Sequence, residues 1–320
     1  MELDRDGFRI PPRFEPARDD LDAFGPRAER APPGAPVALP PALPRARAGA
    51  GKRRVVLAAL ALLFLGAVGG PVILPAVREA VVDWSLSGAD EARARGDTAG
   101  AIGHMDRALA WGGDDHRLFT LRGQLRMEHG DAAGARLDVD RAAGLAPTAP
   151  QPLRLRALVN TILDRPDEAL ADAQAVVDLT APGDPESLNL RAYTRALVRR
   201  DLPEALRDIE QALARGGEEL PEHLDTRGYI LHLLGRDAEA IDDLNRAIDG
   251  MQRTRKQLMQ LVGRVDRAEL DRRVRSIDQS LAVMHHHRGE ACAAAGFAGQ
   301  AEQDLQVAEQ KGYDPSRGVF

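Results

Sequence analysis

The stretch Gly235-Arg236-Asp237-Ala238-Glu239-Ala240-Ile241 decides the fold of this chain. A glycine and an acidic residue form a turn signal, and Leu244, Ala247 and Ile248 then continue the apolar pattern that Ala240 begins. Residues spaced by three, four and seven positions lie on one face of a helix. The stretch therefore predicts a turn that leads into a helix with one packed face.

Related stretches occur at five other places, and each contains a small anchor residue equivalent to Ala240. The intervals between successive anchors are 34, 34, 36, 35 and 61 residues. The anchors are Ala101, Ala135, Ala169, Ala205, Ala240 and Ala301. A recurring period of this length is typical of stacked helical repeats. The chain is thus predicted to contain six units, with a 27-residue insertion before the last anchor.

Each unit is expected to form two helices. Seven residues after each anchor stands a second small or branched residue, in the order Ala108, Ala142, Val176, Ala212, Ala247 and Ala308. Twelve or thirteen residues before each anchor stands another small residue, in the order Ala89, Gly123, Ala157, Ala192, Gly228 and Gly289. Short side chains at these positions allow the two helices of a unit to approach closely.

This pattern resembles the tetratricopeptide repeat (TPR), over roughly residues 78 to 315. The second, fifth and sixth units match best, and the third matches least because Asp164-Arg165-Pro166 replaces its glycine turn. The resemblance implies an all-α, right-handed superhelical solenoid of about six helix-turn-helix repeats. It also implies that the first helices line a concave surface that holds other proteins or peptides. Stacked helical hairpins need neighbours to bury their faces, which favours the same architecture on physical grounds.

An arginine and an aspartate recur in five of the six units. The arginine precedes the small residue of the first helix, and the aspartate lies three residues after the anchor; the pairs are Arg122 with Asp138, Arg156 with Asp172, Arg191 with Asp208, Arg227 with Asp243, and Arg288 with Asp304. One interpretation is ion pairing between helices, which would fix their register and, at exposed positions, contribute at most about 1 kcal/mol each. The other is a charged ladder that meets a ligand.

Residues 1–54 are predicted to be a disordered tail. They hold 11 basic and 8 acidic groups and ten of the 21 prolines of the chain, without a periodic apolar pattern. Such a segment cannot bury enough apolar surface to offset its ordering entropy. The rest of the chain holds 32 basic and 41 acidic groups, and this negative balance argues against nucleic acid as the main partner.

Residues 55–77 carry no charged side chain and are predicted to form a transmembrane helix, about 34 Å long. Five basic residues, Arg45, Arg47, Lys52, Arg53 and Arg54, precede this segment. The positive-inside rule then places the N-terminus in the cytoplasm and residues 78–320 outside a bacterial inner membrane. Two alternatives remain: cleavage as a signal peptide, with Ala67-Val68-Gly69 as the small-residue site, and a buried helix of a soluble domain.

The insertion is expected to extend the repeat domain as a long helical hairpin at about residues 249–282. Leu258, Leu261 and Val265 keep helical spacing through an otherwise charged stretch, as do Val274, Ile277 and Leu281. Gly263 and Asp266 mark the expected turn between the two helices.

The candidate protein-binding groove follows from a stripe beside the packed face of the first helices. Its members are Arg154, Asn189, Tyr193, Asp225, Tyr229, His232, His286 and Glu290. Two of the three tyrosines in the chain fall on adjacent steps of this stripe, where they either anchor a bound peptide or pack between repeats.

No catalytic, cofactor or metal site is predicted. Lys52 is followed by arginine and not by the serine or threonine of a phosphate-binding loop. His285, His286 and His287 are consecutive, so a helix turns them about 100° apart, and they cannot converge on one metal ion. The prediction is a non-enzymatic, membrane-anchored scaffold for protein–protein interactions. Its alternative is a periplasmic or secreted soluble adaptor or chaperone, released by cleavage.

Overall fold

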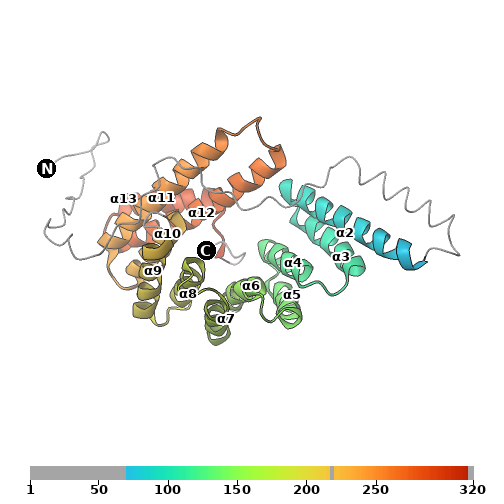
Figure 1. Cartoon of the computed structure of the whole chain (residues 1–320). Helices are drawn as coiled ribbons and strands as arrows, with labels where there is room; N and C mark the ends of the chain where they lie inside the picture. The colour runs from blue at the N-terminus through green and yellow to red at the C-terminus, as the bar shows by residue number, and fades with distance from the viewer. Residues whose placement is uncertain (1–69, 217–219, 316–320) are drawn as a thin grey trace, which may run out of the picture. The chain divides into compact units, whose positions relative to one another are not determined.

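The computed structural model describes residues 70–216 and 220–315. These residues all belong to one compact unit. They form 12 helices and no strand (Figure 1). In chain order the helices are α2 (Gly70–Ala94), α3 (Thr98–Gly112), α4 (His116–Glu128), α5 (Ala132–Leu145), α6 (Pro150–Ile162), α7 (Pro166–Leu179), α8 (Pro185–Leu197), α9 (Leu202–Gly216), α10 (Pro221–Leu233), α11 (Asp237–Met259), α12 (Arg267–Ala294) and α13 (Ala298–Gln310).

The helices pack as six consecutive pairs, from α2 with α3 to α12 with α13. Each even-numbered helix from α4 to α12 also contacts the preceding pair. The described chain is therefore an α-solenoid of six helical hairpins, as the sequence period predicts.

The turn inside each pair contains a residue with left-handed backbone geometry, two positions after the first helix ends. In the third and fourth pairs this residue is Asp164 and Arg199, with φ 53° and 52°. Glycine occupies the position in the other four pairs, with φ between 74° and 85° at Gly96, Gly130, Gly235 and Gly296. The third repeat therefore keeps the turn although it lacks the glycine.

Small residues allow the two helices of a pair to touch. All six anchors have an exposed fraction of 5 % or less. A Cβ added to Gly228 would lie 2.7 Å from the Leu244 side chain and 3.2 Å from the carbonyl oxygen of Ala240. Glycine is therefore needed at residue 228, because the backbones of the two helices are too close to admit a Cβ.

Each of the five predicted arginine–aspartate pairs forms a bidentate contact between the helices of its own repeat. The nitrogen–oxygen distances within these contacts are 2.5–2.9 Å. The aspartates are buried, with exposed fractions of 2–8 %. The sequence-based interpretation as pairing between helices is confirmed, but the pairs are not exposed, because each aspartate is buried and each arginine is half-buried.

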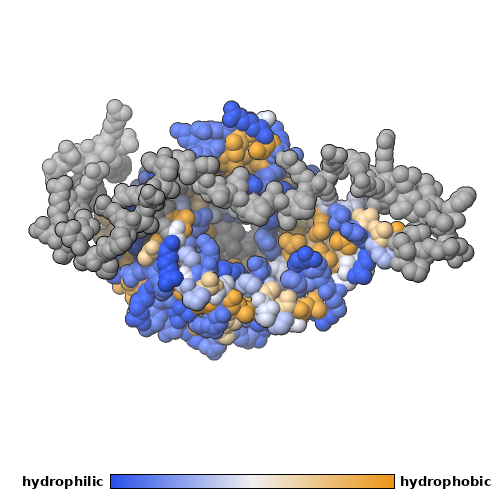
Figure 2. Space-filling view, in the orientation of Figure 1, coloured by the Kyte–Doolittle hydropathy of each residue, from blue (hydrophilic) through white to orange (hydrophobic). Residues whose placement is uncertain are grey.

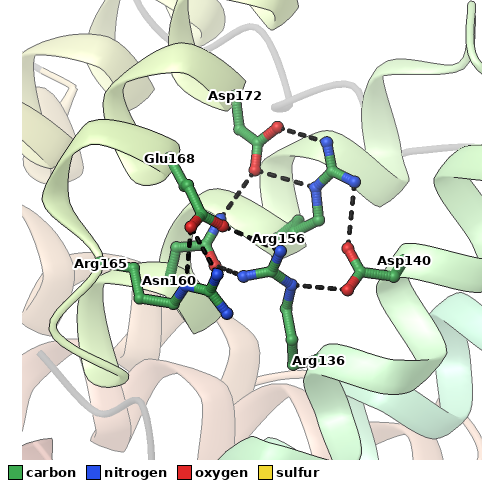
Figure 3. A network of polar contacts seen from close by, with 7 residues as sticks. All are labelled: Arg136, Asp140, Arg156, Asn160, Arg165, Glu168 and Asp172. Atoms are coloured by element: carbon green, nitrogen blue, oxygen red, sulfur yellow. Dashed lines mark hydrogen bonds and ion pairs between the residues drawn. The ribbon is translucent and has the colours of Figure 1, made fainter.

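Four of these arginines also reach back to the preceding repeat. Arg156 contacts Asp140 of α5 at 3.1 Å, in addition to Asp172 of α7 (Figure 3). Arg122, Arg191 and Arg288 make equivalent contacts with Asp106, Gln174 and Asn245. Each such arginine therefore holds three helices in register, because the fixed geometry of a guanidinium serves two acceptors at once.

The predicted transmembrane segment falls mostly outside the described residues, as does the predicted tail. Only residues 70–77 are described, and they form the first two turns of α2, which remains helical through Pro75. Within residues 70–216 and 220–315, no helix has both the length and the apolar character that a membrane crossing requires.

Helices α11 and α12 are longer than the others that follow α2, with 23 and 28 residues. They run past the neighbouring repeats and pack on each other as a hairpin. The chain reverses at Gly263, where φ is 78°, and the Asp266 side chain caps α12. The N-terminal part of α12 then contacts α2 of the first repeat, where Arg272 lies 3.7 Å from Asp90 and Arg275 donates to the carbonyl oxygen of Arg93.

Candidate functional site

A pocket of about 270 Å³ lies between three first helices, α8, α10 and α12. Because α12 extends beyond its neighbour, it supplies one wall of this pocket. The lining residues are Asn189 and Tyr193 of α8, Glu222, Asp225 and Thr226 of α10, and Ser276, Gln279, Ser280, Val283 and Met284 of α12. Three of them, Asn189, Tyr193 and Asp225, belong to the predicted groove.

Two polar atoms at this pocket are buried without a hydrogen-bond partner among the described residues. They are Oδ1 of Asn189 and the hydroxyl oxygen of Tyr193. A buried polar atom left without a partner costs about 1–3 kcal/mol, so native proteins pair almost all such atoms with protein, water or ligand. The pocket therefore presents two polar groups that a bound molecule can satisfy.

Aromatic rings pack beside these two groups. Tyr229 stacks on His287, with ring centroids 4.1 Å apart, and Tyr193 meets both rings edge to face, at 6.3 Å and 6.2 Å. Nδ1 of His287 lies 3.0 Å from Oδ1 of Asp225. This cluster joins α8, α10 and α12, and it fixes the Tyr193 ring at the wall of the pocket.

The electrostatic environment of the pocket is acidic. Glu222 and Asp225 contribute carboxylates, and no arginine, lysine or histidine is among the lining residues. Burial raises the pKa of Tyr193 well above its ordinary value, and the negative charge of Asp225 raises it further. Tyr193 thus stays protonated and keeps a hydroxyl hydrogen to donate.

A second aromatic pair adjoins this cluster, because the rings of His286 and His287 meet edge to face with centroids 6.3 Å apart. His286 stacks on Tyr313, with centroids 3.9 Å apart, and its Nε2 lies 3.5 Å from Glu290. The hydrogen bond from His286 lowers the pKa of Glu290, against the opposing effect of burial. His232 pairs with Asp237 in the turn of its own repeat, at 2.7 Å.

The predicted groove residues have different contact partners, although the His286 ring also touches the ring of His287 beside the pocket. Asn189, Tyr193 and Asp225 meet at the pocket, with Tyr229 packed behind them. His286 and Glu290 contact each other next to Tyr313, and His232 binds its own turn. Arg154 lies between the third and fourth repeats, where it donates to the carbonyl oxygen of Glu186.

The α12 wall is absent from the predicted stripe. A signal for it exists in the sequence, because Ser276, Ser280, Val283, Met284 and His287 recur at helical spacing. That stripe runs across the border between the insertion and the sixth repeat. Neither the repeat period nor the insertion alone therefore identifies it.

The three consecutive histidines point to three different partners. His285 lies 2.8 Å from Asp304, His287 lies 3.0 Å from Asp225, and His286 stacks on Tyr313. Within the described residues, no group of three or more histidine, cysteine, aspartate or glutamate side chains is arranged to hold a metal ion. Cys292 is buried, and burial raises the pKa of its thiol.

Exposed apolar side chains are the other surface feature that could bind a partner. Figure 2 shows hydrophilic residues over most of the described surface, with hydrophobic areas of limited size between them. One such area is on the α11–α12 hairpin, where Met259, Val262 and Val265 have exposed fractions of 43 %, 59 % and 38 %. The pocket at Asn189 and Tyr193 is therefore the better-built candidate site.

Comparison with solved structures finds several similar chains. The chain is similar to PilW, described as a type IV pilus biogenesis factor, with 15 % identity, a TM-score of 0.51, and coverage of 74 % of this chain and 96 % of that one. It is also similar to a tetratricopeptide repeat protein from Parabacteroides merdae ATCC 43184, with 17 % identity, a TM-score of 0.46, and coverage of 73 % and 94 %. A third structure is TTC0263, a TPR protein of Thermus thermophilus, with 16 % identity, a TM-score of 0.46, and coverage of 61 % and 98 %.

No family model matches the sequence, and none of the curated proteins compared with it matches either. The fold assignment therefore depends on the six helical hairpins, on their period of about 34 residues and on the structural similarity to PilW. This chain is a protein of the tetratricopeptide-repeat fold.

Proposed function

We propose that this protein is a scaffold that holds an extended segment of another protein in the pocket between α8, α10 and α12. The observation that carries the proposal is the pair of buried, unpartnered atoms at this pocket, Asn189 Oδ1 and the Tyr193 hydroxyl. A peptide offers backbone and side-chain groups that can satisfy both atoms, and a rigid helical wall limits the entropy lost on binding. The proposed role is binding without chemistry.

A photo-reactive amino acid placed in the pocket wall tests this proposal in intact cells. Gln279 is exposed and lines the pocket, whereas Leu137 on α5 is 71 % exposed and lies outside it. We expect the probe at Gln279 to capture one discrete partner that the probe at Leu137 does not capture. Asn189→Leu should reduce this capture while the chain stays folded. The same set of captured proteins at both positions would contradict the proposal.

We also propose that the scaffold is anchored in a bacterial inner membrane by residues 55–77, with its repeats outside the cytoplasm. The support is the sequence alone: 23 residues without charge follow five basic residues in the preceding ten. A reporter that is active only outside the cytoplasm, fused after Phe320, should be active. A stable, membrane-bound but inactive fusion would refute this orientation. A mature N-terminus near Gly70 would instead support a cleaved, soluble adaptor.

A further inference from the structure

The pocket lining has a clear chemical bias. Of the ten lining residues, Glu222 and Asp225 are acidic, six are neutral and polar, and Val283 and Met284 are apolar. None is basic. A partner group that enters this pocket therefore meets two carboxylates, several oxygen acceptors and no competing cation.

The negative charge of Asp225 is not neutralised by an arginine or lysine among the described residues. Its side-chain partner is Nδ1 of His287, which contacts Oδ1 alone. The arginines on neighbouring helices have other acceptors: Arg191 binds Asp208 and Gln174, and Arg227 binds Asp243. A buried carboxylate with no arginine or lysine in contact with it favours a cationic ligand.

The remaining walls suit the rest of a long basic side chain. Arginine and lysine bury their aliphatic stems on apolar surface while their charged ends stay among polar groups. Met284 and Val283 line the pocket and offer a small apolar area to such a stem, because most of each side chain is covered by the core. The Tyr193 ring stands at the pocket wall, and a cation placed over a tyrosine face is attracted by the negative charge of the ring face.

We propose that this pocket binds an arginine or lysine side chain of the partner segment, with its charged end beside Asp225 and Asn189. Asn189 Oδ1 then accepts a hydrogen bond from the ligand cation, and its unpartnered state in the free protein is explained. This inference rests on the proposed scaffold function and specifies its partner as a segment with a basic side chain. A solvated pocket that binds only water is the outcome that would overturn it.

Binding of small arginine analogues to the purified full chain tests the inference. The probes are the N-acetyl, N-methylamide derivatives of arginine, of its neutral isostere citrulline, and of glutamate, and the measurement is ligand-observed NMR titration. We expect a millimolar dissociation constant for the arginine probe and at least tenfold weaker binding of the citrulline probe. The glutamate probe should not bind. Higher salt should weaken arginine binding, because screening reduces the attraction of the carboxylates.

Variants of the pocket carboxylates provide the matched controls. Asp225→Asn should weaken binding of the arginine probe at least fivefold, and Glu222→Gln, at an exposed position that tolerates change, should weaken it about twofold. Glu302→Gln, a change of the same kind on α13 away from the pocket, should leave it unchanged. Equal binding of the arginine and citrulline probes, or full binding by both pocket variants, would overturn the inference.

The two proposals fail in distinguishable ways. In the first case, the probe at Gln279 captures a partner, and the double variant Asp225→Asn with Glu222→Gln captures it equally well. The scaffold function then stands, and the inference of a basic side chain in the pocket is wrong. In the second case, the probe at Gln279 captures no partner of its own, and Asn189→Leu does not change the captured proteins. The assignment of the scaffold site to this pocket is then wrong.

Discussion

At the residue scale, the five buried aspartates depend on their arginine partners. Removing one member of a buried ion pair leaves an uncompensated charge, whereas replacing both by apolar residues is often tolerated. Arg156→Met should therefore destabilise the chain by about 3 kcal/mol, because Asp172 would keep only its hydrogen bond from Asn160. Arg156→Met with Asp172→Leu should recover most of this loss in urea denaturation. A double variant no more stable than the single one would contradict this argument.

Asp304 makes the stability of the last repeat depend on pH. Burial alone would raise its pKa, but hydrogen bonds from His285 and Arg288 outweigh burial and hold the pKa at about 2. Because this value is below the unfolded value of 3.8, the stabilisation is complete above pH 3.8 and is lost as the pH falls toward 2. Its size is about 2 kcal/mol.

Urea denaturation between pH 4.5 and pH 2 measures this effect. Asp304→Asn should be less stable than the wild type at pH 4.5, and the difference should shrink as the pH is lowered. Glu302→Gln on the same helix serves as the control. A difference between Asp304→Asn and the wild type that stays constant over this range would show that Asp304 is not the titrating group.

At the element scale, the close contact between paired helices limits which side chains fit. A Cβ at residue 228 would lie 2.7 Å from Leu244 and 3.2 Å from a backbone oxygen that cannot move aside. Gly228→Ala should thus destabilise the fifth repeat by about 1–3 kcal/mol, as overpacking does in other cores. Gly103→Ala is the matched control, because nothing lies within 4 Å of its added Cβ. Thermal denaturation of both variants tests this contact, and an unchanged melting temperature for Gly228→Ala would contradict it.

The sequence predicts the repeats well because every unit needs small side chains where its two helices touch. Positions such as Ala240 and Gly228 must be small in every unit, so the spacing alone reveals six helical hairpins. The left-handed turn is predicted less completely, since Asp164 adopts it without being glycine. Asparagine and aspartate tolerate this conformation through local polar contacts, at an energy above that of glycine.

The pocket could be predicted only in part. The stripe beside the packed face includes Asn189, Tyr193 and Asp225, because one rule places these residues on adjacent first helices, and all three line the pocket. It does not lead to Met284 or His287, because α12 combines an inserted segment with the last repeat. The residues that Met284 and His287 contact depend on the length of α12, and the repeat period does not predict that length.

At the scale of the whole described chain, the α11–α12 hairpin connects the sixth repeat to the first. Arg272→Ala with Arg275→Ala should loosen this contact, since these residues bind Asp90 and the carbonyl oxygen of Arg93. We expect faster hydrogen exchange in α2, with less than about 1 kcal/mol of change in total stability, because both contacts are largely exposed. Arg267→Ala, on the same helix and with Asp271 as its partner, is the control. Equal exchange of α2 in both variants would show that the contact does not restrain α2.

The contact between α12 and α2 also restricts how this chain can evolve. A solenoid whose repeats contact only their neighbours can gain or lose a unit and still fold, because each interface is local. Here the hairpin spans the distance that six repeats set. Duplication of one internal repeat would move α2 away from Arg272 and Arg275, and loss of one would bring the two into collision. The number of repeats and the length of the hairpin are therefore expected to change together wherever this contact is kept.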